Sequence, residues 1–207
     1  MTGLAASAAL LSSATLGIVS TAQAAPKTIR VAYLSFAVSN SYDAPMLAAA
    51  KAVAAADGVS VTVFDANNNP ATQYTQLQDV ITSGRYQGII TQPIVSTNLV
   101  PLVEKAIKKG IKVVNIDQIL GASYATDKPQ VRGLSANVVF MPTRIGTLMG
   151  TQVVSACGSK KFNPCNIAYM YNIKGSTLDT AIYNAFNKVV SKHSNIYLYR
   201  QSATVHT

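Results

Sequence analysis

The feature that most constrains the fold is a regular alternation of short apolar segments and longer helical patterns, which begins at residue 28. Strands that alternate with helical segments of about 10 to 15 residues form right-handed βαβ units and a parallel sheet. The apolar segments are nearly continuous, as expected for a parallel sheet that is covered on both faces. We therefore predict an α/β fold with a parallel, doubly wound sheet. Its first four predicted strands are residues 28–36, 59–65, 86–92 and 111–117.

Local signals place the ends of the three helices between these strands. Asp43 and Ser96 are short polar residues that are predicted to cap the first and the third helix. Pro70 suits the first turn of the second helix, because the N–H that it lacks has no partner there in any case. Gly84 and Gly110 are predicted to end the second and the third helix, since glycine readily adopts the left-handed conformation of a helix end.

The alternation is interrupted after residue 117, and residues 134–138 are predicted to form a short strand that leaves the first sheet. A second α/β unit begins near residue 138 and contains two predicted strands and two predicted helices. Two strands form a poor sheet core, so this unit is expected to be incomplete. The predicted organisation is an N-terminal α/β lobe, residues 25–136, and a partial C-terminal α/β lobe, residues 137–207.

The first 24 residues have the character of a secretory signal peptide. They carry no charge, contain an apolar run, and end in a small-x-small pattern at Ala22–Ala24. A membrane anchor is the alternative, but the run is short, rich in alanine and serine, and followed by no stop-transfer pattern. We therefore predict that residues 1–24 are removed and that the mature chain is secreted across the inner membrane, to a periplasmic or extracytoplasmic location.

The chain has 17 basic and 8 acidic residues, a formal net charge of +9, which raises the question of a nucleic-acid partner. Its lysines are scattered, and the densest group, residues 105–112, closes a predicted helix. Cations at that position complement the partial negative charge of the helix end. No basic segment is combined with the aromatic residues of a nucleic-acid-binding module, so no nucleic-acid partner is expected.

The two cysteines of the chain are Cys157 and Cys165. In an exported protein, an even number of closely spaced cysteines favours a disulfide. Gly158, Asn163 and Pro164 supply turn residues for the small loop between them. A metal site is the alternative, but two thiolates without a nearby histidine do not make a zinc site. We predict a structural disulfide, no metal and no cofactor.

Polar side chains follow three of the four predicted strands of the first lobe. Ligands of open parallel sheets bind outside the carboxyl ends of the strands, so these side chains are expected to face a shared crevice. Carboxylates and amides beside an aromatic ring suit a neutral polyol, whose hydroxyls both donate and accept hydrogen bonds. The candidate ligand-binding residues of this lobe are Asn40, Tyr42, Asp43, Gln92, Asp117 and Gln118.

Each of these residues also has a purely structural interpretation. An Asp at a strand end, such as Asp117, commonly caps a helix or a turn. Asn40 also suits the turn before the first helix, Tyr42 also suits packing against the strand, and Gln92 also suits a bond to the local backbone. For Asp117 we favour a role in ligand binding over a capping role, because the strand ends converge on one edge of the sheet.

The sequence offers no support for catalysis. It contains no G-x-G-x-x-G after the first strand, no P-loop and no G-x-S-x-G elbow. Its histidines, His193 and His206, come late in the chain and are interpreted as surface residues. An exported flavodoxin-like hydrolase is an alternative, but Asp43 or Asp117 would then need partners that the sequence does not show. We assign no catalytic residue and expect a protein that is not an enzyme.

Three segments together are similar to a known family. They are "AYLSFAVSNSYDAPMLAAAKAVA", "VFDANNNPATQYTQLQDVITSGRYQGIITQP" and "AIKKGIKVVNID". From about Lys27 to Gln201 the chain resembles the periplasmic sugar-binding proteins of ABC importers, of the ribose- and galactose-binding type. The resemblance implies two Rossmann-like lobes with strand order 2-1-3-4-5 and a ligand between the lobes. It also implies a longer chain, so the sequence is interpreted as C-terminally truncated, with the second lobe incomplete.

The resemblance further assigns roles to residues. It implies that Asn40 and Tyr42 bond to the sugar and stack on it, and that Asp117 accepts hydrogen bonds from its hydroxyls. It makes Thr177 and Asp179 candidate contacts from the second lobe, and Asn137 a structural or peripheral residue.

Departures from the family pattern bear on the ligand. Gln118 stands where the ribose-binding type often has Arg, Asp43 where a second aromatic is common, and Ile182 near a frequent Arg. The expected ligand is therefore a sugar or a similar small polar solute, and the expected partner is an ABC permease in the membrane. The resemblance also allows a sensor module for a chemoreceptor or a histidine kinase. We expect a monomer.

Overall fold

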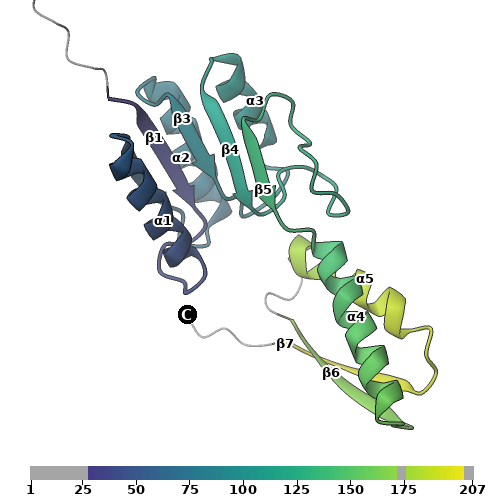
Figure 1. Cartoon of the computed structure of the whole chain (residues 1–207). Coiled ribbons are helices and arrows are strands. Elements are labelled where there is room, and N and C mark those ends of the chain that lie inside the picture. The colour runs from purple at the N-terminus through teal and green to yellow at the C-terminus, as the bar shows by residue number, and fades with distance from the viewer. Residues whose placement is uncertain (1–27, 172–175, 203–207) are drawn as a thin grey trace, which may run out of the picture.

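The computed structural model describes residues 28–171 and 176–202. The predicted signal peptide, residues 1–24, and His206 lie outside the described residues. No helix in the described part of the chain combines the length and the hydrophobicity that crossing a membrane requires. The described residues form two α/β units, which we call the first and the second lobe (Figure 1).

The first lobe is built on a five-stranded parallel sheet with the order β2-β1-β3-β4-β5, which confirms the predicted fold class and strand order. Helix α1 lies on one face of the sheet, and α2 and α3 lie on the other (Figure 1). The strands are β1 (Arg30–Ser35), β2 (Ser60–Asp65), β3 (Gly88–Thr91), β4 (Lys112–Asp117) and β5 (Ala136–Val139). The helices are α1 (Asp43–Ala56), α2 (Pro70–Ser83) and α3 (Val100–Lys108).

The core of the first lobe lies between the sheet and the helices α2 and α3. Leu34, Leu77, Ile89 and Val103 are almost completely buried there and form one continuous cluster. The opposite face is covered by α1 near β1, whereas Val138 on β5 remains 66% exposed. The covered face fixes the positions of the strands, and therefore the positions of the residues at their carboxyl ends.

The helix ends agree with the sequence in three cases and differ from it in two. Pro70 begins α2, as predicted. Gly84 ends α2 with φ 63°, and Gly110 follows α3 with φ 82°, as predicted. The prediction that Asp43 caps α1 is wrong, because Asp43 is already helical and its carboxylate turns inward. The prediction that Ser96 caps α3 is also wrong, because this helix begins only at Val100 and the Ser96 hydroxyl has a distant partner.

Residues 134–138 do not leave the first sheet as predicted. Ala136–Val139 form β5, which pairs with β4 in parallel. A side-chain hydrogen bond accompanies this pairing, since the Asn115 amide nitrogen donates to the Asn137 carbonyl oxygen at 2.9 Å. Asn137 in turn donates to the backbone oxygen of Asp127 at 2.8 Å, which gives it a structural role. The predicted lobe boundary therefore falls within a strand.

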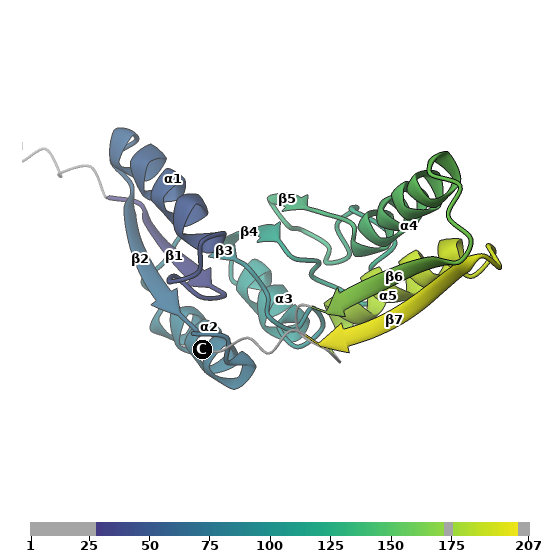
Figure 2. The same ribbon diagram turned by 90° about the horizontal axis from the view of Figure 1, so that it is seen from below.

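The second lobe consists of α4 (Pro142–Ser159), β6 (Cys165–Tyr171), α5 (Thr177–Val190) and β7 (Ile196–Ser202), with β6 and β7 paired in parallel. Both helices pack on the same side of the two strands (Figure 2). A cluster of rings, Tyr169, Tyr171, Tyr183 and Phe186, fills the space between them.

The predicted disulfide is confirmed. Cys157 and Cys165 are joined by a bond between their sulfur atoms, and both side chains are buried. The bond ties the last turn of α4 to the first residue of β6, and so it closes the second lobe at its outer end.

Candidate functional site

The carboxyl edge of the first sheet brings together the six candidate residues of the first lobe. Asn40, Tyr42 and Asp43 come from the loop after β1 and the first turn of α1. Gln92 follows β3 directly, Asp117 is the last residue of β4, and Gln118 follows it. They lie together because β1, β3 and β4 are neighbours in the sheet and run in the same direction.

Gln92 stands at the centre of this cluster. Its amide nitrogen donates one hydrogen bond to Asp43 and another to Asp117 Oδ2, the latter at 2.9 Å. Its amide oxygen accepts from the Phe36 N–H at 3.2 Å, which leaves the nitrogen pointing at the carboxylates. Its backbone oxygen accepts from the Gln73 amide at 2.8 Å. Gln92 is only 1% exposed, and its amide holds the two carboxylates in place from the buried side of the cluster.

Asn40 and Asp43 form one local structure. The Asn40 carbonyl oxygen accepts from the backbone N–H groups of Tyr42, at 2.9 Å, and Asp43, at 2.6 Å. Its amide nitrogen donates to the Asp43 carboxylate. Asn40 therefore occupies the turn position that the sequence allows for it, and it satisfies backbone donors at the start of α1. The Asp43 carboxylate, 2% exposed, lies at the positive end of the helix dipole.

Asp117 has the most unusual backbone in the cluster. Its φ of 64° lies in the left-handed region, which costs a non-glycine residue about 1–2 kcal/mol but which Asp tolerates better than most. Its Oδ2 accepts from Gln92 and from the Gln118 amide at 3.0 Å. Its Oδ1 is buried and has no hydrogen-bond partner among the described residues. The strained backbone thus presents the Asp117 carboxylate at the edge of the sheet.

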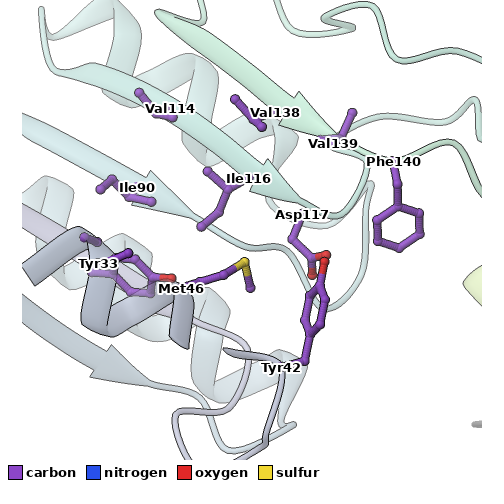
Figure 3. Close-up of a pocket in the computed structure, with 12 residues that line it drawn as sticks. Tyr33, Tyr42, Met46, Ile90, Val114, Ile116, Asp117, Val138, Val139 and Phe140 are labelled. Atoms are coloured by element: carbon purple, nitrogen blue, oxygen red, sulfur yellow. The ribbon is translucent and has the colours of Figure 1, made fainter. Parts of the chain in front are cut away.

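Two tyrosines stand beside the carboxylates (Figure 3). Tyr42 is 60% exposed and points its hydroxyl at Asp117. Its pKa is raised first by partial burial, and then by the charge of Asp117, a hydrogen bond to the Asp117 side chain and the charge of Asp43. Burial, together with the same two charges, raises the pKa of Tyr33 to about 12. The Tyr33 hydroxyl is buried and has no hydrogen-bond partner in the part of the chain that the structure describes. Both phenols are therefore neutral at physiological pH and can donate hydrogen bonds.

A cavity of about 550 Å³ opens next to the cluster, between α1 and strands β3 to β5 (Figure 3). Most of its wall is apolar, with Met46, Ile116 and Val138 among the lining residues. Asp117 and Tyr42 also line it, and Figure 3 shows them facing each other at the carboxyl end of β4. A hydroxylated ligand fits that end of the cavity better than its apolar part, because the Asp117 carboxylate and the Tyr42 hydroxyl lie there.

The two candidate residues of the second lobe, Thr177 and Asp179, contact other residues than the six polar candidates of the first lobe. The Thr177 hydroxyl lies 2.8 Å from the Tyr124 hydroxyl. Asp179 is buried in the first turn of α5, where its N–H donates to the Ser176 hydroxyl at 3.1 Å. Burial and the charge of Asp179 raise the pKa of Tyr169 to about 12, which places this carboxylate beside the ring cluster of the second lobe. Their role in ligand binding remains a prediction.

Several neighbours of the site were not predicted from sequence. Tyr33 reads as a strand residue of the core, and Gln73 as a polar residue on an exposed helix face, yet both contact the cluster or its support. Tyr124 lies in the segment without a clear period, so it carries no local signal. His193 is half-buried at the end of the second lobe. Within the described residues, no three His, Cys, Asp or Glu side chains gather in a way that could hold a metal ion.

These features define a class of protein: two α/β lobes, with a polar site at the carboxyl edge of the parallel sheet in the first lobe. The family model for the periplasmic binding protein domain matches residues 31–205. The chain therefore belongs to the periplasmic binding protein domain family. Proteins of this family work outside the cytoplasm, and they bind ligands rather than convert them.

Solved structures share this fold. One is the periplasmic binding protein component of the arabinose ABC transporter from Shewanella sp. ANA-3, bound to L-arabinofuranose, with 21% identity and a TM-score of 0.66 over 84% of this chain. A second is a periplasmic solute-binding protein of an ABC transporter from Actinobacillus succinogenes 130z with bound D-allose, with 23% identity and a TM-score of 0.65 over 85% of this chain. A third is the fructose-binding periplasmic domain of a hybrid two-component system, with 20% identity and a TM-score of 0.66 over 86% of this chain.

The chain spans only 54%, 59% and 55% of the length of these three structures, respectively. At such identities the likeness establishes the fold alone. No curated protein matches the chain.

Proposed function

We propose that this protein is an extracytoplasmic solute-binding subunit of an ABC importer, which binds a sugar or a similar small polar solute at the Asp117 cluster. The buried Oδ1 of Asp117 carries this proposal: it has no hydrogen-bond partner among the described residues, although the Tyr42 hydroxyl lies against the same carboxylate. A buried acceptor without a partner costs free energy unless a ligand satisfies it, and a hydroxyl is a donor of suitable size. The family and the sugars named for the three similar structures support the same ligand class.

The charge of the site argues for a neutral ligand. Asp43 and Asp117 bond to the same amide nitrogen, so two carboxylates lie within a few ångströms of it. An anionic solute would be repelled there, whereas hydroxyl donors would be attracted. Tyr42 and Phe140, which both line the cavity beside Asp117, offer aromatic faces for the apolar side of a sugar ring.

A second candidate function is a sensor module. It is favoured by the likeness to the fructose-binding periplasmic domain of a hybrid two-component system. The two functions share the ligand site and differ in the membrane partner. Solute uptake in a strain that lacks the gene distinguishes them, because an importer subunit is required for uptake and a sensor subunit for the transcriptional response.

The ligand test is a thermal-shift and calorimetric screen of residues 25–207 with pentoses, hexoses, polyols and amino acids. A bound sugar raises the melting temperature, because it stabilises the folded state by RT ln(1 + L/Kd), where L is the sugar concentration. The diagnostic variant is Asp117→Asn, because Asn tolerates the left-handed backbone while a neutral amide, with one acceptor oxygen and one donor nitrogen, replaces the charged carboxylate. A hydrogen bond to a charged group contributes about 1.5–3 kcal/mol, so Kd is expected to rise about 10- to 150-fold.

Asp79→Asn is the matched control, since Asp79 is exposed on α2 and the change in charge is the same. Sugar binding that is weakened by Asp117→Asn and unaffected by Asp79→Asn supports the proposal. Equal affinity of the two variants would remove Asp117 from the site. A shift with amino acids alone would replace the proposed ligand class.

The remaining parts of the proposal have separate tests. Secretion with removal of residues 1–24 predicts that the mature N-terminus is Ala25, which N-terminal sequencing of the exported protein checks. A monomeric state predicts a molar mass of one chain in light scattering. An enzymatic role is contradicted by the recovery of unaltered sugar after incubation with the protein.

A further inference from the structure

The hydroxyl of Tyr124 is the meeting point of the two lobes. It donates to the Ser96 hydroxyl at 2.9 Å and lies 2.8 Å from the Thr177 hydroxyl. Ser96 belongs to the turn between β3 and α3 in the first lobe, and Thr177 is the first residue of α5 in the second. Since a phenol has one proton, Thr177 donates to the Tyr124 oxygen when Tyr124 donates to Ser96.

The backbone of Tyr124 makes a further connection to the second lobe. Its carbonyl oxygen accepts from the Thr143 hydroxyl at 3.0 Å and from the Thr143 N–H at 3.5 Å. Thr143 is in the first turn of α4. A single residue of the loop between β4 and β5 therefore contacts the first turns of both helices of the second lobe.

The loop that carries Tyr124 is itself held in place. The Gln130 side chain clamps the adjacent residue Ser123, accepting from its N–H and donating to its carbonyl oxygen, both at 2.8 Å. At the start of the loop, the Gly121 N–H donates to the backbone oxygen of Ser96 at 3.0 Å. Gly121 has φ 145°, and a Cβ there would lie 2.6 Å from Gln130, so only glycine allows this clamp. Tyr124 thus projects from a fixed support.

We infer that Tyr124 is a positioning residue, which orients the first turn of α5, with Thr177 and Asp179, relative to the carboxyl edge of the first sheet. The Ser96 hydroxyl is buried, so the bridge is anchored in the core of the first lobe rather than at its surface. Thr177 is exposed, and its hydroxyl contacts the Tyr124 hydroxyl, which makes this bond a direct link between the lobes. The part of the inference that concerns ligand affinity rests on the proposed function.

The test measures the distance between the lobes without any ligand. Spin labels are attached at Lys51 on α1 and Lys160 after α4, both exposed, in the full chain with its disulfide intact. Tyr124→Phe removes only the hydroxyl. A neutral hydrogen bond shifts a two-state equilibrium about three- to tenfold, so a second, differently spaced population is expected to grow by that factor in double electron–electron resonance.

Thr177→Val provides the independent variant, because Thr177 is exposed and its loss leaves the Ser96 bond intact. It is expected to shift the populations as Tyr124→Phe does. Because both substitutions remove the same bond between Tyr124 and Thr177, adding Thr177→Val to Tyr124→Phe is expected to cause no further shift. Tyr197→Phe, at an exposed position on β7, is the control that leaves the distances unchanged. If Tyr124→Phe does not fold, Thr177→Val alone decides.

Distance distributions of Tyr124→Phe and Thr177→Val that match the wild type would overturn the inference. Ligand affinity forms the second readout: a sugar that requires both lobes binds about three- to tenfold more weakly to Tyr124→Phe. If the wild-type chain binds no sugar, the proposed function fails, while the distance measurement still decides the role of Tyr124.

Discussion

The packing of α4 against α5 yields a sharp prediction about Gly146. A Cβ at this position would lie 2.0 Å from the backbone oxygen of Ile182 and 2.9 Å from the Ala185 Cβ. Gly150, one turn further along, faces Val189 with a corresponding distance of 2.8 Å. Residues four apart lie on the same face of a helix, so the two glycines form one flat surface on which α5 rests.

Gly146→Ala is therefore expected to destabilise the second lobe. To reach the 3.4 Å of ordinary van der Waals contact, α5 would have to move away by more than an ångström, because the obstacle at 2.0 Å is backbone rather than a flexible side chain. Overpacking costs typically about 1–3 kcal/mol, and this geometry points to the upper end. The better helix propensity of alanine returns up to about 1 kcal/mol. The expected net loss is about 2 kcal/mol.

Gly158→Ala is the matched control in the same helix. A Cβ at Gly158 meets nothing within 4 Å, so the substitution keeps only the gain in propensity, about 0.5 kcal/mol near a helix end. The two variants should thus differ by about 2.5 kcal/mol in the free energy of unfolding.

Urea denaturation followed by tyrosine fluorescence and near-ultraviolet circular dichroism measures this difference. The ring cluster of the second lobe supplies much of that signal, and the chain contains no tryptophan to obscure it. Amide hydrogen exchange in α5 provides a probe that is specific to the lobe. Equal unfolding free energies for the two variants would refute the close approach of α4 and α5.

Three further predictions concern the disulfide, Tyr33 and the two faces of the first sheet. Reduction of the Cys157–Cys165 bond, which closes a loop with a sequence separation of 8, is expected to lower stability by about 2.5 kcal/mol in urea titrations, and an unchanged midpoint would contradict this. Because the pKa of Tyr33 is raised from 10.0 to about 12, stability is complete below pH 10 and should fall as the pH rises from 10 to 12, and Tyr33→Phe should flatten that fall. Val113→Ala in the core should cost about 2 kcal/mol and Val138→Ala on the open face less than about 0.5 kcal/mol; comparable losses would mean that β5 is covered.

The site combines a rigid support with a carboxylate oxygen, Asp117 Oδ1, that has no hydrogen-bond partner among the described residues. The amides of Gln73 and Gln92 are held by backbone groups, and Gln92 in turn orients Asp43 and Asp117. Such preorganisation lowers the entropy cost of binding, because the polar groups need not reorient when a ligand arrives. The left-handed backbone of Asp117 is the strained element of this arrangement, which is where functional residues are commonly found.

The amino-acid sequence by itself determined the first four strands of the sheet and the edge at which the candidate residues lie. Apolar segments separated by amphipathic ones admit only a parallel sheet covered by helices, and parallel strands end at a common edge. This is why Gln92 and Asp117, 25 positions apart, could be predicted to meet. The disulfide could also be predicted, because the chain has two cysteines and they allow only one pairing within it.

The tertiary structure decided which atom each polar side chain serves. The sequence treats Asp43 and Ser96 as helix caps, since local spacing is all that it displays, but each finds a stronger partner far away in the chain: Gln92 for Asp43 and Tyr124 for Ser96. The strand β5 likewise joins the first sheet because the edge of β4 is available for pairing. The residues of β5 alone do not indicate which sheet the strand joins. Local patterns specify the backbone, whereas hydrogen-bond partners depend on which distant groups the fold brings within reach.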